Sequence, residues 1–393
     1  MSEPETGTHH RVVVIGGGYA GTLAANRLLG RDDVAVTLVN PRATFVDRIR
    51  LHQLVARTGA ATTDLAGLLA PEVDLVVDGA RRIDTVDRTV HLASGRTLDY
   101  DYVVYAVGST GAVPSTVPGA VEHAASVAEL EPALRLRDRL AALDPAAPVV
   151  VVGGGLTGIE TAAELVERGR RVTLVSGSPL APSLSAAGRR YIDRWLRHNG
   201  ARVVTGRVAE VHPDAVVLAD GSTLPSALTV WTAGFGVPGL ATASGLRTDE
   251  LGRLLTDETL TSVDDARVVA AGDAAAPSGH PLRMSCQAAG PLGALAADTV
   301  LSRLAGTAPP TLDLAFVGSC VSLGRKSGIR QFGRKDDTPL DLWFGGRAGA
   351  AYKELTCRWG IAKLGREARR PGSLTWLRGG RRSLAGAPKV AAS

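Results

Sequence analysis

The chain has only three cysteines in 393 residues, and no two of them stand at C-x-x-C or C-x₄-C spacing. This arrangement excludes a local dithiol centre, and no zinc-ligand spacing is present, so no metal site is expected. No run of 18 apolar residues occurs and residues 1–10 are polar, which predicts neither a membrane span nor a secretory signal. A phosphate loop ending in Gly-Lys-Ser/Thr is also absent. Few unpaired cysteines suit a reducing cytoplasm, the predicted location.

Lysine is absent from residues 1–325, and all five lysines lie between Lys326 and Lys389. Residues 326–393 also hold ten arginines and only five acids, so this segment carries +10 while the rest of the chain carries −5. A basic segment on an acidic body indicates an anionic partner. We do not expect that partner to be nucleic acid, because no aromatic-interleaved patch or known reader motif accompanies the charge.

Two segments, 137 residues apart, each join a run of β-branched residues to a G-x-G-x-x-G turn and an apolar helix face. The first glycine makes a tight turn, the second lets the backbone approach a pyrophosphate, and the third lets the helix pack on its strand. The first copy contains Gly16, Gly18, Tyr19, Ala20 and Gly21, and the second contains Gly153, Gly155, Leu156, Thr157 and Gly158. The duplication predicts two dinucleotide sites.

The position just past the strand that follows each loop usually carries an acid that binds the ribose hydroxyls. Here these positions hold Asn40 and Ser176. Asparagine still accepts a ribose hydrogen bond, whereas serine removes the carboxylate that repels a 2′-phosphate. Arg189 and Arg190 follow only more than a dozen residues later, so the sequence leaves NADH and NADPH open at the second site.

A short apolar strand near residue 270 ends in Gly272 and Asp273. Together with the two loops, this resembles the FAD-dependent pyridine-nucleotide oxidoreductases over about residues 11–300. The resemblance implies that the first loop binds FAD, that the second binds NAD(P)H, and that Asp273 contacts the FAD ribityl chain. Gly108 and Gly234 belong to two further segments of the resemblance, although Val107 replaces a usual threonine.

The implied fold is α/β, with two Rossmann-like dinucleotide-binding domains. We expect an FAD domain over 1–115 and 245–310, an inserted NAD(P)H domain over 116–244, and a C-terminal region over 311–393. The turn-rich stretches 109–119 and 234–239 favour these boundaries.

The missing dithiol excludes a disulfide reductase, and residues 40–53 lack the cysteine of the peroxidase-like relatives. Electrons are therefore expected to leave the flavin directly for an external acceptor. The chain looks nearest to the type II NADH dehydrogenases and the apoptosis-inducing-factor-like quinone reductases, in which an Ala-Gln-x-Ala-x-Gln segment lies under the flavin. Here Cys286, Gln287 and Ala289 stand in that segment, Pro291 replaces its second glutamine, and a helix is expected over 292–304.

Four residues are candidates for a place near the flavin: Gln287, Cys286, Arg48 and His52. Cys286 is either a redox thiol or a small apolar filler. Arg48 and His52 are four residues apart and would share a helix face, where they either steady the reduced flavin and orient a substrate, or remain solvated. No general acid or base is expected, because hydride transfer between stacked rings does not require one.

Residues 348–366 place Ala348, Tyr352, Leu355, Trp359 and Ala362 on one helix stripe, beside basic residues. Such a helix can lie on an anionic membrane, and the resemblance to type II NADH dehydrogenases favours peripheral contact with the inner face of the cell membrane through residues 348–382. The alternative is a helix packed on the flavin domain or on a homodimer partner.

The expected reaction is hydride transfer from NADH or NADPH to FAD, followed by reduction of an acceptor, first of all a quinone. One alternative is a soluble reductase that serves a ferredoxin-like protein or a biosynthetic oxygenase. Another is a nucleotide-sensing flavoprotein with slow turnover.

Overall fold

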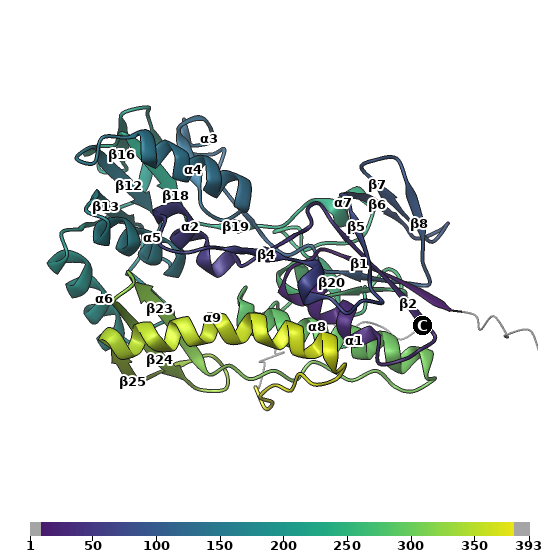
Figure 1. Ribbon diagram of the computed structural model, residues 1–393. Coiled ribbons are helices and arrows are strands. Elements are labelled where there is room, and N and C mark those ends of the chain that lie inside the picture. The colour runs from purple at the N-terminus through teal and green to yellow at the C-terminus, as the bar shows by residue number, and fades with distance from the viewer. Residues whose placement is uncertain (1–8, 381–393) are drawn as a thin grey trace, which may run out of the picture.

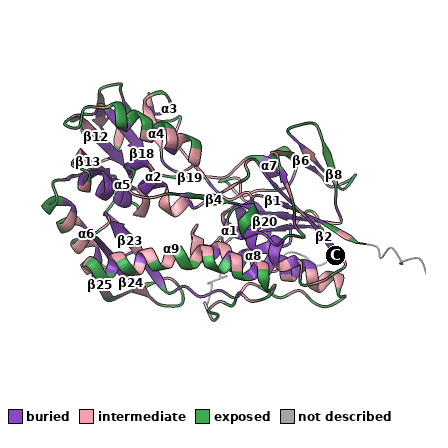
Figure 2. Ribbon diagram, in the orientation of Figure 1, coloured by how far each residue is buried: buried purple, intermediate pink, exposed green. Residues whose placement is uncertain are grey.

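The computed structural model describes residues 9–380 of the chain. These residues form two five-stranded parallel sheets, three three-stranded antiparallel sheets and three two-stranded pairs. Helices cover the large sheets, whose strands are buried (Figures 1 and 2). The predicted α/β class is confirmed.

The first large sheet is built around the strand that precedes the first glycine loop. From edge to edge it contains β21 (Val268–Ala270), β9 (Tyr102–Tyr105), β1 (His10–Ile15), β2 (Val34–Asn40) and β5 (Asp74–Val77). Residues 12–15 of β1 are at most 4% exposed. A parallel strand buried on both faces requires such a continuous apolar run.

The second large sheet repeats this arrangement around the second loop. It contains β11 (Ala124–Ser126), β18 (Leu228–Trp231), β12 (Pro148–Val152), β13 (Arg171–Ser176) and β14 (Arg202–Thr205). In both sheets the strand before the loop lies third from either edge, with the strand that follows the loop helix beside it. The two loops therefore occupy equivalent positions.

The chain enters and leaves the second sheet through one antiparallel pair, β10 (Thr110–Gly111) with β19 (Phe235–Gly236). Two small meanders accompany the large sheets. They are β6 (Ala80–Asp84), β7 (Thr89–Leu92) and β8 (Thr97–Asp99), and β15 (Val208–Val211), β16 (Ala215–Leu218) and β17 (Thr223–Pro225). The paired entry and exit favour an inserted second domain, whose exact boundaries stay a prediction.

Helices and short elements connect these sheets. They are α1 (Tyr19–Leu28), β3 (Thr44–Val46), η1 (Arg48–Arg50), α2 (Leu51–Ala56), β4 (Thr62–Asp64), η2 (Ala66–Leu68), α3 (Ala120–His123), α4 (Leu130–Ala142), α5 (Leu156–Glu167), α6 (Ala186–His198), α7 (Leu240–Ala243), β20 (Leu254–Thr256), η3 (Gly272–Ala274), β22 (Ala275–Pro277) and α8 (Cys286–Leu304). The loop helix α1 packs on α8.

The helix expected over 292–304 begins six residues earlier, at Cys286. Ser285 caps it, because its hydroxyl accepts a hydrogen bond from the Ala288 N–H at 3.3 Å. Pro291 lies inside the helix and ends no element. The expected start at residue 292 is therefore six residues too late.

The C-terminal region forms a third meander, β23 (Gly318–Leu323), β24 (Ser327–Gly333) and β25 (Pro339–Gly345), followed by α9 (Gly346–Arg369). Helix α9 lies along this sheet and reaches α1 (Figure 1). The predicted helix is therefore present, and it packs on the first domain. The part of the predicted membrane segment beyond residue 380, which includes Arg381 and Arg382, lies outside the described residues.

The face through which α9 packs is not the predicted apolar stripe. Its buried residues are Gly349, Lys353, Cys357, Leu364 and Glu367. Leu355 and Trp359 of the stripe are 42% and 56% exposed. The helix buries its opposite, more polar face, where ion pairs and hydrogen bonds compensate the charges. In the described chain no helix has the length and hydropathy needed to cross a membrane.

Candidate functional site

The two glycine loops have the same internal packing. A Cβ on Gly21 would lie 1.8 Å from the Gly16 carbonyl oxygen, and one on Gly158 would lie 1.9 Å from that of Gly153. The first glycines adopt φ +107° and +123°, which favour glycine. These four positions are therefore fixed by close backbone packing.

The second glycine of each loop differs, because a Cβ on Gly18 or Gly155 would meet nothing within 4 Å. Both residues precede a helix, and their extended backbones suit any residue. An open space at a helix N-terminus, reached by backbone N–H groups, fits a pyrophosphate. Tyr19 and Ala20 open α1, and Leu156 and Thr157 open α5, as predicted from the motif.

Arg48, Ser109 and Asp273 form one polar network beside the first loop. The Arg48 guanidinium donates to the Ser109 carbonyl at 2.6 Å, and the Ser109 hydroxyl donates to Asp273 Oδ2 at 2.7 Å. Asp273 Oδ1 accepts from the Ser285 N–H at 3.2 Å. A carboxylate has about four lone-pair sites, so Asp273 can still accept from the hydroxyls of a polyol. Burial lowers the pKa of Arg48, against the opposing effect of Asp273.

Gly108 and Gly272 allow the network of Arg48, Ser109 and Asp273 to lie close to the first glycine loop. Both have positive φ, +71° and +73°, and a Cβ on Gly272 would lie 3.1 Å from that of Ala20. A Cβ on Gly108 would lie 4.0 Å from the Arg48 guanidinium. The predicted FAD residues therefore gather around one space. Ser109 was not predicted, although its place directly after Gly108 is a usable signal.

Asn40 and Ser176 each contact the middle of a glycine loop, Asn40 in the first loop and Ser176 in the second. Asn40 Oδ1 accepts the Gly17 N–H at 2.9 Å. A Cβ on Gly154 would lie 1.9 Å from Ser176 Oγ, so Ser176 touches the corresponding glycine of the second loop. Gly234 follows β18 with φ +88°, at the end of the neighbouring strand. The residues predicted for NAD(P)H thus share one edge of the second sheet.

Arg48 and His52 do not share a helix face. Arg48 lies in η1 and reaches Ser109, whereas His52 lies in α2 and is 3% exposed. His52 Nδ1 is 3.8 Å from Glu160 Oε2, and its Nε2 has no partner within the described residues. The prediction of a shared face is wrong, because the chain changes from a 3₁₀ turn to an α-helix between the two residues. Neither side chain is solvated.

A buried pair joins α5 to α9 next to His52. Lys353 Nζ lies 2.9 Å from Glu160 Oε1, which also accepts the Ser322 N–H at 2.8 Å. Neither Glu160 nor Lys353 was predicted as a site residue. The glutamate lies two residues after the last loop glycine, but nothing in the sequence identified its partner.

Cys286 and Gln287 lie at the start of α8. Burial raises the pKa of the Cys286 thiol to about 11. This favours the interpretation of Cys286 as a small, space-filling apolar residue over that of a redox thiol. The Gln287 amide, oriented to satisfy both partners, donates to the Gly318 carbonyl at 3.1 Å and accepts from the Val317 N–H at 3.0 Å. Gln287 therefore ties α8 to the C-terminal sheet.

Helix α9 also touches the first loop. The Tyr19 hydroxyl donates to Asp47 Oδ1 at 2.8 Å, and a Cβ on Gly360 would lie 3.2 Å from the Tyr19 ring. Burial and Asp47 raise the pKa of Tyr19 well above its ordinary value, so this hydroxyl stays protonated. The C-terminal helix is therefore packed directly on the predicted FAD loop.

Residues 10–293 match a family model described as pyridine nucleotide-disulphide oxidoreductase. The chain belongs to the pyridine nucleotide-disulphide oxidoreductase family. Its three cysteines include no pair at C-x-x-C or C-x₄-C spacing, and none of them is in a disulfide. The protein is an FAD-dependent NAD(P)H oxidoreductase.

Individual relatives agree with this assignment. An NADH dehydrogenase-like protein of Mycobacterium tuberculosis is 34% identical over 349 residues, covering 81% of this chain and 87% of its own length. A type II NADH:quinone oxidoreductase of Haemophilus influenzae is 25% identical, covering 67% and 73%. The solved ferredoxin reductase of Rhodopseudomonas palustris superposes with a TM-score of 0.70 at 25% identity and covers 83% of each chain.

FAD, when bound, supplies the chemistry by accepting a hydride from the nicotinamide and passing electrons on. The protein contributes position and electrostatics. The two open loops would hold the pyrophosphates, and Asp273 would hold the ribityl hydroxyls from a position fixed by Ser109 and Arg48.

Proposed function

We propose that the protein is an NAD(P)H:quinone reductase that works at an anionic membrane surface. The observation that carries this proposal is the exposed stripe on α9. Leu355 and Trp359 stand 42% and 56% exposed, while the opposite face of the helix is packed on the protein (Figure 2). Large side chains exposed together on one helix face indicate a surface that something else covers.

Basic residues surround this stripe. Arg347, Arg358, Lys363 and Arg366 are all exposed on α9. Among them only Arg358 forms an ion pair within the described residues, to Glu354 at 3.0 Å. Each basic residue near anionic lipid adds about 1 kcal/mol of attraction, and a tryptophan suits the bilayer interface. The combination favours a lipid surface as the partner.

The stripe lies close to the predicted flavin site. Trp359 is next in the chain to Gly360, which packs on the ring of Tyr19 in the first loop. An acceptor dissolved in the membrane would therefore meet the protein beside the flavin. This is the property required of a quinone reductase that has no membrane span among its described helices. The similarity to a type II NADH:quinone oxidoreductase supports the same acceptor.

Co-sedimentation with liposomes tests the proposal. We expect the protein to pellet with vesicles rich in anionic lipid, and Leu355→Ser/Trp359→Ser to lower this binding by at least about tenfold, because two large apolar groups no longer enter the interface. Quinone reduction in those vesicles should fall in parallel, with little change for a water-soluble dye.

The matched control is Val86→Ser/Val121→Ser, which removes two exposed apolar side chains, 88% and 58% exposed, from other elements. Binding of this control should equal that of the wild type. A wild-type protein that stays in the supernatant at every anionic lipid content would refute the membrane proposal.

A second candidate acceptor is a ferredoxin-like protein. The similarity to a ferredoxin reductase at 25% identity favours it, and the basic face of α9 could dock an acidic partner. Its signature is reduction of an acidic iron–sulfur protein at a rate that falls steeply with ionic strength, together with no liposome binding.

A further inference from the structure

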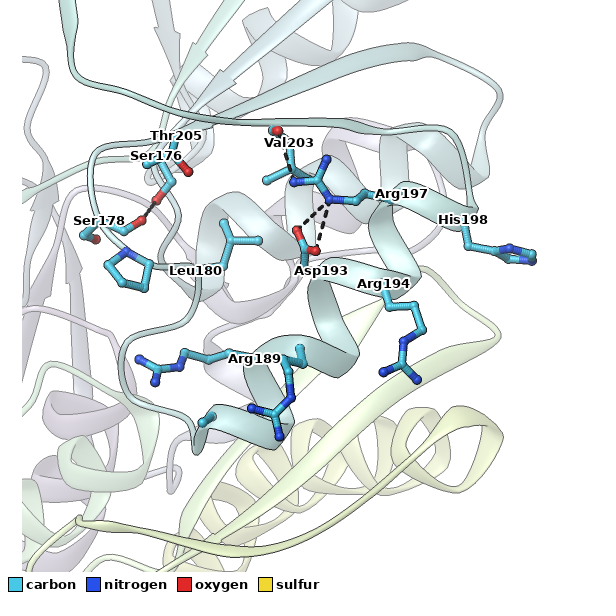
Figure 3. A pocket seen from close by; sticks show the side chains of 13 residues that line it. Ser176, Ser178, Leu180, Arg189, Asp193, Arg194, Arg197, His198, Val203 and Thr205 are labelled. Atoms are coloured by element: carbon cyan, nitrogen blue, oxygen red, sulfur yellow. Dashed lines mark hydrogen bonds and ion pairs between the residues drawn. The ribbon is translucent and has the colours of Figure 1, made fainter.

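A pocket of about 910 Å³ opens where β13 ends, between the segment after Ser176 and helix α6 (Figure 3). Ser176, Ser178 and Leu180 line one side of it. Four arginines of α6, Arg189, Arg190, Arg194 and Arg197, line the other side. The pocket therefore includes Ser176, the residue that touches Gly154 of the second glycine loop.

The side chain at position 176 stands where the adenosine ribose of a dinucleotide is recognised. Ser176 ends β13 and touches Gly154 inside the loop, just as Asn40 ends β2 and bonds Gly17 in the first loop. An acid at this position binds the ribose hydroxyls and repels a phosphate on them. Ser176 carries no charge, and its hydroxyl donates to the Ser178 carbonyl at 2.6 Å.

No free carboxylate compensates the arginines of the pocket. Asp193 is the only acid among the lining residues, and both its oxygens accept from Arg197 Nε at 3.0 Å. Figure 3 shows this pair as dashed lines and shows Arg189 and Arg194 without any. Within residues 9–380, Arg189, Arg190 and Arg194 have no ion-pair or side-chain hydrogen-bond partner. The pocket thus presents three unneutralised guanidinium groups.

Without a bound anion, the positions of Arg189, Arg190 and Arg194 destabilise helix α6. Arg190 and Arg194 are four residues apart on α6, where like charges repel. Arg189 lies in the first turn, which contains no acid, and cations there oppose the helix dipole. A dianionic phosphate would offset both costs, since guanidinium groups bind phosphate through paired, charge-assisted hydrogen bonds.

We propose that this pocket binds the 2′-phosphate of NADPH and that the enzyme uses NADPH in preference to NADH. Ser176 admits the phosphate, and Arg189, Arg190 and Arg194 supply its counter-charge. The inference rests on the NAD(P)H half of the proposed function and is independent of the acceptor.

Two measurements on the FAD-loaded protein test it. Calorimetry compares the binding of 2′,5′-ADP with that of 5′-AMP, which lacks only the 2′-phosphate, and anaerobic stopped-flow compares flavin reduction by NADPH and NADH. We expect 2′,5′-ADP to bind at least about tenfold more tightly and NADPH to show the lower Kd, because one charge-assisted hydrogen bond is worth about tenfold in affinity.

Variants assign the effect to residues. Arg189→Gln and Arg190→Gln should each weaken NADPH binding by about tenfold and leave NADH binding nearly unchanged. Ser176→Glu should invert the preference by adding a repelling carboxylate. Arg168→Gln removes an exposed arginine of the same domain outside the pocket and should change neither Kd.

Equal binding of 2′,5′-ADP and 5′-AMP by the wild-type protein would overturn the inference, whether or not the variants fold. Faster reduction and tighter binding with NADH would also overturn it. Selective binding of 2′,5′-ADP without flavin reduction by either coenzyme would support the phosphate site while refuting the proposed function.

Discussion

Lys353 Nζ lies 2.9 Å from Glu160 Oε1, although the two residues come from α9 and from the helix of the second glycine loop. The side chains are only 9% and 7% exposed. Burial alone would raise the pKa of Glu160, but the ammonium of Lys353 lowers it below its ordinary value. The pKa of Lys353 is raised by the same pairing, against the effect of burial. Both groups therefore remain charged in the folded protein.

Removing one member of this pair should be costly. We expect Lys353→Met to lower the free energy of unfolding by about 3–5 kcal/mol, because Glu160 would remain charged and buried without a partner. Lys353→Met/Glu160→Gln should recover part of the loss. Urea unfolding followed by circular dichroism measures both. Asp99→Asn, which breaks the exposed pair with Arg11, is the control and should cost under about 1 kcal/mol. Equal losses for the two single variants would contradict the prediction.

Acid should destabilise the protein through His52. Burial lowers its pKa from 6.5 to about 4, with Glu160 opposing and Lys353, Arg325 and Arg50 reinforcing the shift. The unfolded state then binds the proton more readily, so stability is complete above pH 6.5 and falls as the pH drops toward 4. Between pH 6.5 and 4.5 the loss should be about 2 kcal/mol.

Comparison with His52→Gln isolates this loss. The titration of Glu160, whose pKa is lowered in the folded protein, occurs in both proteins and so largely cancels in this comparison. Thermal unfolding across the interval should show a smaller decrease for the variant than for the wild type. Parallel curves for the two proteins would exclude His52 as the source.

The second loop offers a matched pair of glycine substitutions. Gly155→Ala should fold normally and weaken coenzyme binding by at least about tenfold, because its Cβ enters only the open space at the helix terminus. Gly158→Ala should lower the free energy of unfolding by about 1–3 kcal/mol or more, since its Cβ would meet the Gly153 carbonyl oxygen. Coenzyme titration and chemical unfolding of the FAD-loaded protein check the two effects. A stable Gly158→Ala variant would show that the packing relaxes easily.

Cys286 should be dispensable for electron transfer. Because burial raises the pKa of its thiol to about 11, only about one molecule in a thousand carries the reactive thiolate at pH 8. We expect Cys286→Ala to reduce its flavin with NADPH or NADH at a rate within about twofold of the wild type. Stopped-flow absorbance measures this rate, with Cys320→Ala as the control. A large loss in the Cys286 variant alone would restore the redox-thiol reading.

The loops were predictable because each depends on local chemistry. Gly16, Gly21, Gly153 and Gly158 are required by contacts within a few residues or to the neighbouring strand, and so the motif appears in the sequence. The assignment of Asp273 to the flavin site followed from the resemblance of the sequence motifs to a known family. The place of Ser109 after Gly108 marks it in the sequence, but its contacts could be assigned only from the fold, because its partners Arg48 and Asp273 lie 61 and 164 residues away.

The orientation of α9 could not be predicted from apolar spacing. Its buried face carries Lys353 and Glu367. Glu160 compensates the charge of Lys353, and Arg27 compensates that of Glu367, which also accepts backbone N–H groups of residues 372–374. Hydrophobic periodicity predicts that charged residues such as these face solvent, and it therefore indicates the opposite face of α9 as the apolar one. Only partners distant in the sequence decide between the two faces.

The late position of Lys353 also bears on the order in which the protein is made. Glu160 leaves the ribosome 193 residues before the lysine that neutralises it. A growing chain whose second sheet has already formed must keep this carboxylate hydrated until α9 is synthesised. We therefore expect α5 to be held by α9 only at the end of translation, when the last helix supplies the missing cation.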